Sequence, residues 1–212
     1  MQQPIILVSL IKPGKSVLSP DYTAPFRDLG PAITAGQTGT YLDLPKWNGL
    51  DLDALPCQKM GFANVRFPVN IQSYDLPARR AVFDAFARTT SEMPQFAYSF
   101  IMFEGYTLQG VKAIPEDSTA FPHRADAIIV APVLVYQPDS TLDETASRFG
   151  EELREIIHRA GGSMELHAYV NYASGTESPQ NMYGYEPWRL ARLRALKKKY
   201  DPKRRFPFYA PF

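Results

Sequence analysis

Polar side chains suited to binding and acid–base chemistry gather in the stretch HAYVNY, residues 167–172. If this stretch is a strand, His167, Tyr169 and Asn171 lie on one face and Tyr172 points to the other, because side chains alternate along a strand. Imidazole, phenol and amide groups both donate and accept hydrogen bonds. We therefore treat the stretch as a candidate substrate-binding segment.

A carboxylate ends a second candidate stretch, FAYSFIMFE, residues 96–104. The period of two in a strand places its alternate residues on one face, namely Phe96, Tyr98, Phe100, Met102 and Glu104. Desolvation beside these apolar side chains would raise the pKa of Glu104, which makes it a candidate acid or base. An exposed carboxylate at the end of a strand is an equally good interpretation of Glu104. The other four side chains could line an apolar substrate pocket, and packing in the protein core is the alternative for them.

Common sequence motifs for nucleotide and metal binding are absent. There is no Walker A loop, no G-x-G-x-x-G after a strand, no H-E-x-x-H and no paired C-x-x-C. His123, His158 and His167 fall in different predicted elements without metal-ligand spacing, so we expect no metal site. Cys57 is the single cysteine, and we expect a small buried apolar residue there.

Strand and helix signals alternate along the chain. The predicted strands are 5–11, 62–67, 95–104, 127–136 and 165–172. Helices are predicted after an Asp75 N-cap, from about 143 to 160, and from about 187 to 200, where Leu196 and Tyr200 would face inward. This order predicts an α+β fold, an antiparallel or mixed sheet with helices packed on one face and a C-terminal strand, loop and helix.

Charge and hydropathy exclude several classes of function. The net charge is +1, although nine basic side chains crowd residues 189–205, and no base-stacking array accompanies them, so we expect no nucleic-acid partner. No apolar run is long enough for a membrane span and the opening residues lack the features of a signal peptide, which favours a soluble, cytoplasmic protein. Residues 13–60 show little periodicity, and we expect a long loop forming part of a pocket or mouth.

The C-terminal segment resembles that of the berberine bridge enzyme-like FAD-linked oxidases, in the vanillyl-alcohol oxidase superfamily. That family's pattern is a strand ending in N-Y, a loop with Y-G, and a helix R-L-x-x-L-K-x-K-Y-D-P leading to a Phe. The matching residues are Asn171, Tyr172, Tyr183, Gly184, Arg192, Leu193, Leu196, Lys197, Lys199, Tyr200, Asp201, Pro202 and Phe206. APFRDLGP at 24–31 and TAFPHR at 119–124 extend the resemblance toward the family's fungal substrate domain.

The resemblance implies a substrate domain without its flavin domain. It implies FAD as cofactor, yet the FAD-binding region and the R-x-G-G-H attachment motif are absent, so we expect the chain by itself to hold FAD poorly or not at all. It further implies that Tyr172 acts as catalytic base, that Tyr183 lies in the substrate-binding loop, and that residues 1–164 form a substrate-binding region. Residues 165–212 then form the C-terminal strand and helix of the same compact unit.

Three functions follow from these observations. The first is the substrate half of a FAD-linked oxidase acting on a small natural product of secondary metabolism. The second is a cofactor-free isomerase, dehydratase or cyclase derived from that family, since orientation and a few polar groups suffice for such steps. The third is a non-catalytic protein that binds a hydrophobic or aromatic metabolite. A homodimer or a separate flavin-domain chain is the expected protein partner.

Overall fold

The computed structural model describes residues 4–54 and 57–210 and divides the chain into two units, one of them Ile5–Met60 and the other containing Gly61–Phe212. The smaller unit holds α1 (Pro20–Arg27), the 3-10 helix η1 (Tyr41–Asp43) and α2 (Leu44–Trp47). None of its described residues is buried. The sequence predicted a long loop here, and these short helices correct that prediction.

The larger unit contains an antiparallel sheet built around β4 (Ile128–Tyr136). β1 (Ala63–Arg66) and β2 (Val69–Ile71) pair with successive parts of β4 along one edge, and β3 (Phe100–Gly105) pairs along the other. Phe67 continues the ladder between β1 and β2 by donating its N–H to the carbonyl oxygen of Pro132, at 2.9 Å. The predicted α+β fold is confirmed.

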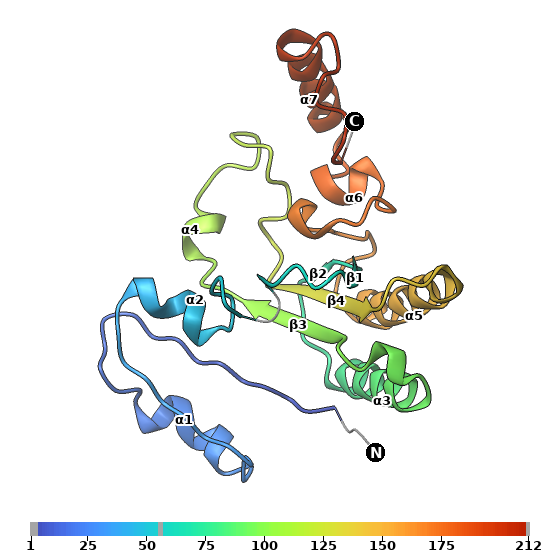
Figure 1. Ribbon diagram of the computed structural model, residues 1–212. Coiled ribbons are helices and arrows are strands. Elements are labelled where there is room, and N and C mark those ends of the chain that lie inside the picture. The colour runs from blue at the N-terminus through green and yellow to red at the C-terminus, as the bar shows by residue number, and fades with distance from the viewer. Residues whose placement is uncertain (1–3, 55–56, 211–212) are drawn as a thin grey trace. The chain divides into compact units, whose positions relative to one another are not determined.

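Two long helices cover one face of this sheet, α3 (Leu76–Glu92) and α5 (Ser140–Arg159). They contact each other, and α5 also contacts β1, β2 and β4 (Figure 1). Apolar side chains from both helices and from the covered face form the core. Burying this apolar area is the main stabilising contribution to the unit.

Local sequence signals explain where the helices begin. Asp75 caps α3 by accepting a hydrogen bond from the N–H of Ala78 at 2.8 Å, as predicted. α5 begins three residues earlier than predicted because Asp139 caps it by accepting from Thr141 N–H. α7 (Pro187–Tyr200) has the predicted bounds, but its predicted inward residues are not buried, since Leu196 is 43% and Tyr200 73% exposed.

Two of the predicted strands are wrong. Residues 5–11 form no strand, and their apolar side chains are exposed, because no described segment pairs with them. Residues 165–172 make one isolated bridge, between His167 and Asn70, before the chain turns into η4 (Val170–Tyr172). Cys57 is exposed rather than buried.

Short helices complete the larger unit: η3 (Pro94–Phe96), α4 (Gln109–Lys112) and α6 (Pro179–Tyr183). No helix among the described residues is long and apolar enough to cross a lipid bilayer.

Candidate functional site

The second face of the sheet, opposite α3 and α5, carries the candidate site. Strand pairing aligns Arg66 with Val133 and Val133 with Phe100, so these side chains share one face. Met102 lies two residues and Glu104 four residues beyond Phe100 on β3, so both side chains are on this same face. Phe100 is 38% exposed there. The sequence prediction that Phe100, Met102 and Glu104 lie together on one strand face therefore agrees with the structure.

The carboxylate of Glu104 accepts hydrogen bonds from two phenols. Tyr172 Oη donates to Glu104 Oε1 at 2.8 Å, and Tyr106 Oη donates to Glu104 Oε2 at 2.5 Å. The two residues named as catalytic candidates from sequence, Tyr172 and Glu104, are thus in direct contact. Hydrogen bonds to an ionised acceptor are stronger than those between neutral groups.

Burial, together with the hydrogen bond to Glu104 and its charge, raises the pKa of Tyr172. The hydrogen bond to Glu104, followed by burial, raises the pKa of Tyr106 to about 12. Both phenols are therefore protonated at neutral pH and act as donors, and the group able to accept a proton is the carboxylate of Glu104.

The turn that carries Tyr172 is held from two sides. Tyr209 Oη donates to the carbonyl oxygens of Val170 and Ala173, at 2.5 and 3.2 Å. The guanidinium of Arg66 lies 5.7 Å from the centre of the Tyr172 ring, close enough for a cation–π contact.

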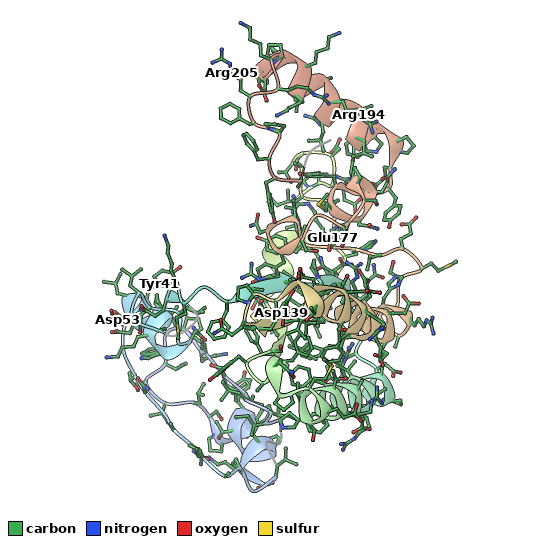
Figure 2. The ribbon with its side chains drawn as sticks, turned by 45° about the vertical axis from the view of Figure 1, so that its right-hand side comes forward. Tyr41, Asp53, Asp139, Glu177, Arg194 and Arg205 are labelled. Atoms are coloured by element: carbon green, nitrogen blue, oxygen red, sulfur yellow. The ribbon has the colours of Figure 1, made fainter. Side chains whose placement is uncertain are left out.

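A buried carboxylate anchors the loop that follows Tyr172. Glu177 accepts the backbone N–H groups of Ser174 and Gly175 at 2.9 and 3.1 Å, and Arg154 Nη1 on α5 at 2.9 Å. Glu177 is labelled in Figure 2, where it lies between the sheet region and the C-terminal segment. Its side chain is fully buried. This ion pair fixes the loop, and with it Tyr172, to the helical layer.

Phe96 and Tyr98 do not belong to this site. Pro94 begins a 3-10 turn, so the strand starts only at Phe100. Phe96 is fully buried in the core, with its ring centre 5.5 Å from that of Tyr136. Tyr98 precedes the strand and packs edge-on against Phe62. The prediction that both share the face of Glu104 is wrong.

The remaining predicted substrate-binding residues lie in three places. Tyr169 packs against the Tyr172 ring at 5.2 Å, and Asn171 Nδ2 donates to Tyr169 Oη at 2.7 Å, so these two adjoin the Glu104 site. His167 instead stacks on His123. Tyr183 Oη donates to the carbonyl oxygen of Ala210 at 3.2 Å.

Sequence reasoning missed two residues of the site. Tyr106 lies two places beyond Glu104, and its position in the sequence could have suggested it. Arg66 reaches the site through the pairing of β1 with β4, which local pattern does not reveal.

Comparisons with known proteins fit this geometry. The family model described as "Berberine and berberine like" matches residues 168–210, which include η4, α6 and α7. The FAD-linked oxidoreductase chyH of Penicillium rubens is 41% identical over 209 residues, and the FAD-linked oxidoreductase chry5 of Gibberella zeae is 43% identical over 209 residues. Each match covers 98% of this chain.

The chain is similar to one segment of the berberine bridge enzyme-like FAD-linked oxidoreductases.

This berberine bridge enzyme-like chain spans about two fifths of its curated relatives, 42% of chyH and 41% of chry5. A carbohydrate oxidase from Microdochium nivale, solved in complex with a substrate analogue, superposes with a TM-score of 0.62 at 19% identity. That match covers 90% of this chain and 42% of the oxidase. At this identity the likeness establishes the fold.

The described residues of the berberine bridge enzyme-like chain do not fit FAD by themselves. Cavities of about 370 and 260 Å³ lie among the described residues, and neither of these two is lined by Glu104 or Tyr172. Four carboxylates line the larger cavity and would repel a pyrophosphate. The second face of the sheet is exposed only toward its edge, since Phe100 on β3 is 38% exposed whereas Ala131 and Val133 on β4 are fully buried. The described residues thus provide one wall of a site but no enclosure for a dinucleotide.

Proposed function

We propose that this chain forms the substrate-binding wall of a FAD-linked oxidoreductase that acts on a small natural product. The observation that carries the proposal is the pair of hydrogen bonds from Tyr172 and Tyr106 to Glu104, on the sheet face opposite α3 and α5. The matched relatives chyH and chry5 are named as FAD-linked oxidoreductases. In our proposal, FAD is held mainly by protein outside the described residues.

Glu104 is the proposed proton acceptor, and Tyr172 the group through which the proton travels. A substrate hydroxyl beside Tyr172 Oη could pass its proton to the phenol while the phenolic proton moves to Glu104. This relay needs no free phenolate, which the raised pKa of Tyr172 disfavours. In flavoenzymes the redox step belongs to the cofactor, and the protein supplies binding, orientation and electrostatics.

Aromatic side chains around Glu104 support a substrate with an apolar ring or chain. Phe100 and Met102 lie on the same face, and Tyr169 adjoins Tyr172. Such a surface offers stacking and apolar contact beside one proton-accepting group, as small-molecule sites commonly do.

A second candidate function is cofactor-free acid–base catalysis, such as isomerisation, dehydration or cyclisation. It is favoured by one observation, that a carboxylate and two phenols are assembled where the described residues form no enclosure for FAD. A carboxylate paired with a phenol can remove a proton at one atom and return it at another.

A segment exchange distinguishes the two functions. This chain is purified alone, and is also placed in chyH of Penicillium rubens in place of the matching segment of that protein. Both proteins are incubated with a panel of hydroxylated aromatic compounds, and oxygen uptake and product masses are measured. The oxidoreductase proposal predicts that only chyH carrying this chain takes up oxygen, and that its products are two hydrogen atoms lighter than the substrates. The isolated chain should do neither. Products of unchanged mass or lighter by one water, formed by the isolated chain without oxygen uptake, would support the second candidate.

A further inference from the structure

A second cluster of reactive side chains lies outside the Glu104 site, where His123, Asp126 and His167 meet. One imidazole nitrogen from each histidine and one oxygen of Asp126 lie within 4.8 Å of one another. His123 is 5% and Asp126 6% exposed, and the His167 side chain is 14% exposed. These groups are too deeply placed to be ordinary surface side chains.

The hydrogen bonds of the cluster leave one nitrogen of each ring with a free lone pair. His123 Nε2 is 2.8 Å from the carbonyl oxygen of Asn181, which can only accept, so Nε2 carries the hydrogen and Nδ1 is the acceptor. His167 Nδ1 lies 3.0 and 3.1 Å from the two oxygens of Asp126 and donates to them. A histidine that binds a metal is usually held as His123 is, by an oxygen acceptor on the opposite ring nitrogen.

Protonation favours His123 as a ligand. Burial, together with the neighbouring His167, lowers the pKa of His123 to about 4, so this ring is neutral at pH 7. Burial lowers the pKa of His167, but the hydrogen bond and charge of Asp126 outweigh it and the net shift is upward.

The surrounding charge favours a cation. Besides Asp126, the carboxylates of Glu116, Glu165 and Glu186 line the cavity of about 370 Å³ above the cluster. The guanidinium of Arg189 lies 2.7 Å from Glu186 and 3.8 Å from Glu116. Four carboxylates against one guanidinium leave a negative excess that attracts cations.

We propose that His123, Asp126 and His167 form a binding site for a divalent transition metal ion of the zinc class. Two imidazoles and one carboxylate are donors that select such ions over Mg²⁺ and Ca²⁺, which prefer sites made of oxygen alone. The remaining coordination position faces the cavity and is open to water or to a small ligand.

Metal binding requires one ring to turn. The two imidazoles are stacked, with centroids 4.4 Å apart and planes 18° from parallel. A ligating nitrogen directs its lone pair in the plane of its ring, so nearly parallel rings this far apart do not converge on one ion. His167, the more exposed of the two, is the ring that turns. Its turn breaks the hydrogen bond from Nδ1 to Asp126, which frees that carboxylate to bind the ion. The ion then links the segment containing His123 and Asp126 to the segment that precedes η4.

The test titrates the untagged full chain, freed of metal by chelation, with Zn²⁺ and separately with Mg²⁺, using calorimetry. Co²⁺ is added as a spectroscopic probe, because its visible absorption reports coordination by protein ligands. We expect one equivalent of Zn²⁺ to bind and to raise the melting temperature, and Mg²⁺ to do neither. His123→Ala, His167→Ala and the nearly isosteric Asp126→Asn should each weaken Zn²⁺ binding by about 10-fold to 100-fold or more.

His158→Gln is the matched control, since His158 lies on α5 outside the cluster. It should leave Zn²⁺ affinity unchanged. The proposal is overturned if Zn²⁺ leaves the melting temperature of the wild-type chain unchanged and produces no binding heat. It is also overturned if the His158 variant loses binding while folded cluster variants keep it. The wild-type titration decides the matter even where a cluster variant does not fold.

Discussion

Glu104 is the residue on which the proposed chemistry depends, because it receives hydrogen bonds from two tyrosines at once. The arrangement raises the pKa of both phenols and so keeps them protonated. Tyr172 alone, with its raised pKa, is a poor base. The sequence named Tyr172 and Glu104 separately, and their roles stay predictions. Their contact joins residues 68 positions apart, which no local pattern specifies.

The pKa of Tyr106 gives a prediction at alkaline pH. Its value of about 12 in the folded chain exceeds the ordinary 10.0 because the phenol donates to Glu104. The folded state thus holds this proton more tightly, so the contribution to stability is present below pH 10 and is lost as pH rises through about 12. Glu104→Gln should return the pKa of Tyr106 toward 10, which ultraviolet absorbance of the phenolate measures.

Tyr136 provides the internal control for this titration. Burial and its hydrogen bond to Asp143 raise the pKa of Tyr136 to about 12. Glu104→Gln should leave this late-titrating phenol unchanged. A titration curve identical in wild type and Glu104→Gln would show that Tyr106 is not governed by the carboxylate.

Elements with strong local signals were predicted well, and those that depend on distant partners were not. α3 begins after the predicted Asp75 cap, and α7 has the predicted bounds, with Pro202 shortly beyond its end. The stretches 5–11 and 165–172 have strand-like residues but lack a full pairing partner among the described residues. β-propensity measures how well a residue fits a strand that is already paired and half-buried, so residues with high propensity form no strand where a partner is missing.

Close contact between α5 and the sheet gives a prediction at the scale of an element. A Cβ added at Gly150 would overlap the ring of Phe67, which is buried at the centre of the core. Gly150→Ala should therefore lower the free energy of unfolding by about 1–3 kcal/mol, despite the higher helix propensity of alanine. Denaturant unfolding followed by circular dichroism measures this change.

Gly110→Ala is the matched control, because a Cβ at Gly110, in the short helix α4, meets nothing within 4 Å. It should be neutral or slightly stabilising. Equal stability of the two variants would contradict the close packing of α5 on Phe67.

At the scale of the whole molecule, the two units differ in how they are stabilised. The larger unit has a continuous core, whereas no described residue of Ile5–Met60 is buried. A segment without a core has little apolar burial to offset its conformational entropy. The matches to chyH and chry5 include 98% of the chain, so both units belong to the matched region.

Limited proteolysis tests this difference. Chymotrypsin should cut first within Ile5–Met60, at exposed aromatic residues such as Tyr22 and Tyr41, and only later within β4 or α5. Mass spectrometry of the earliest fragments identifies the sites. After denaturation, Tyr136 and Phe149 should be cut as readily as the others. An initial cut inside residues 128–159 of the native chain would contradict the assignment of the core.

The central claim is that Glu104, through Tyr172, accepts the substrate proton in a FAD-linked oxidoreductase. The most direct test uses chyH in which this chain replaces the matching segment. Substrate is added without oxygen, and the rate at which the bound flavin is reduced is measured from the loss of its visible absorbance, its bleaching. Glu104→Gln should slow bleaching by about 10²-fold to 10⁴-fold, the range for loss of a general base. Glu144→Gln, which alters an exposed carboxylate on α5, should leave the rate unchanged. Equal bleaching rates in the two variants would contradict the claim.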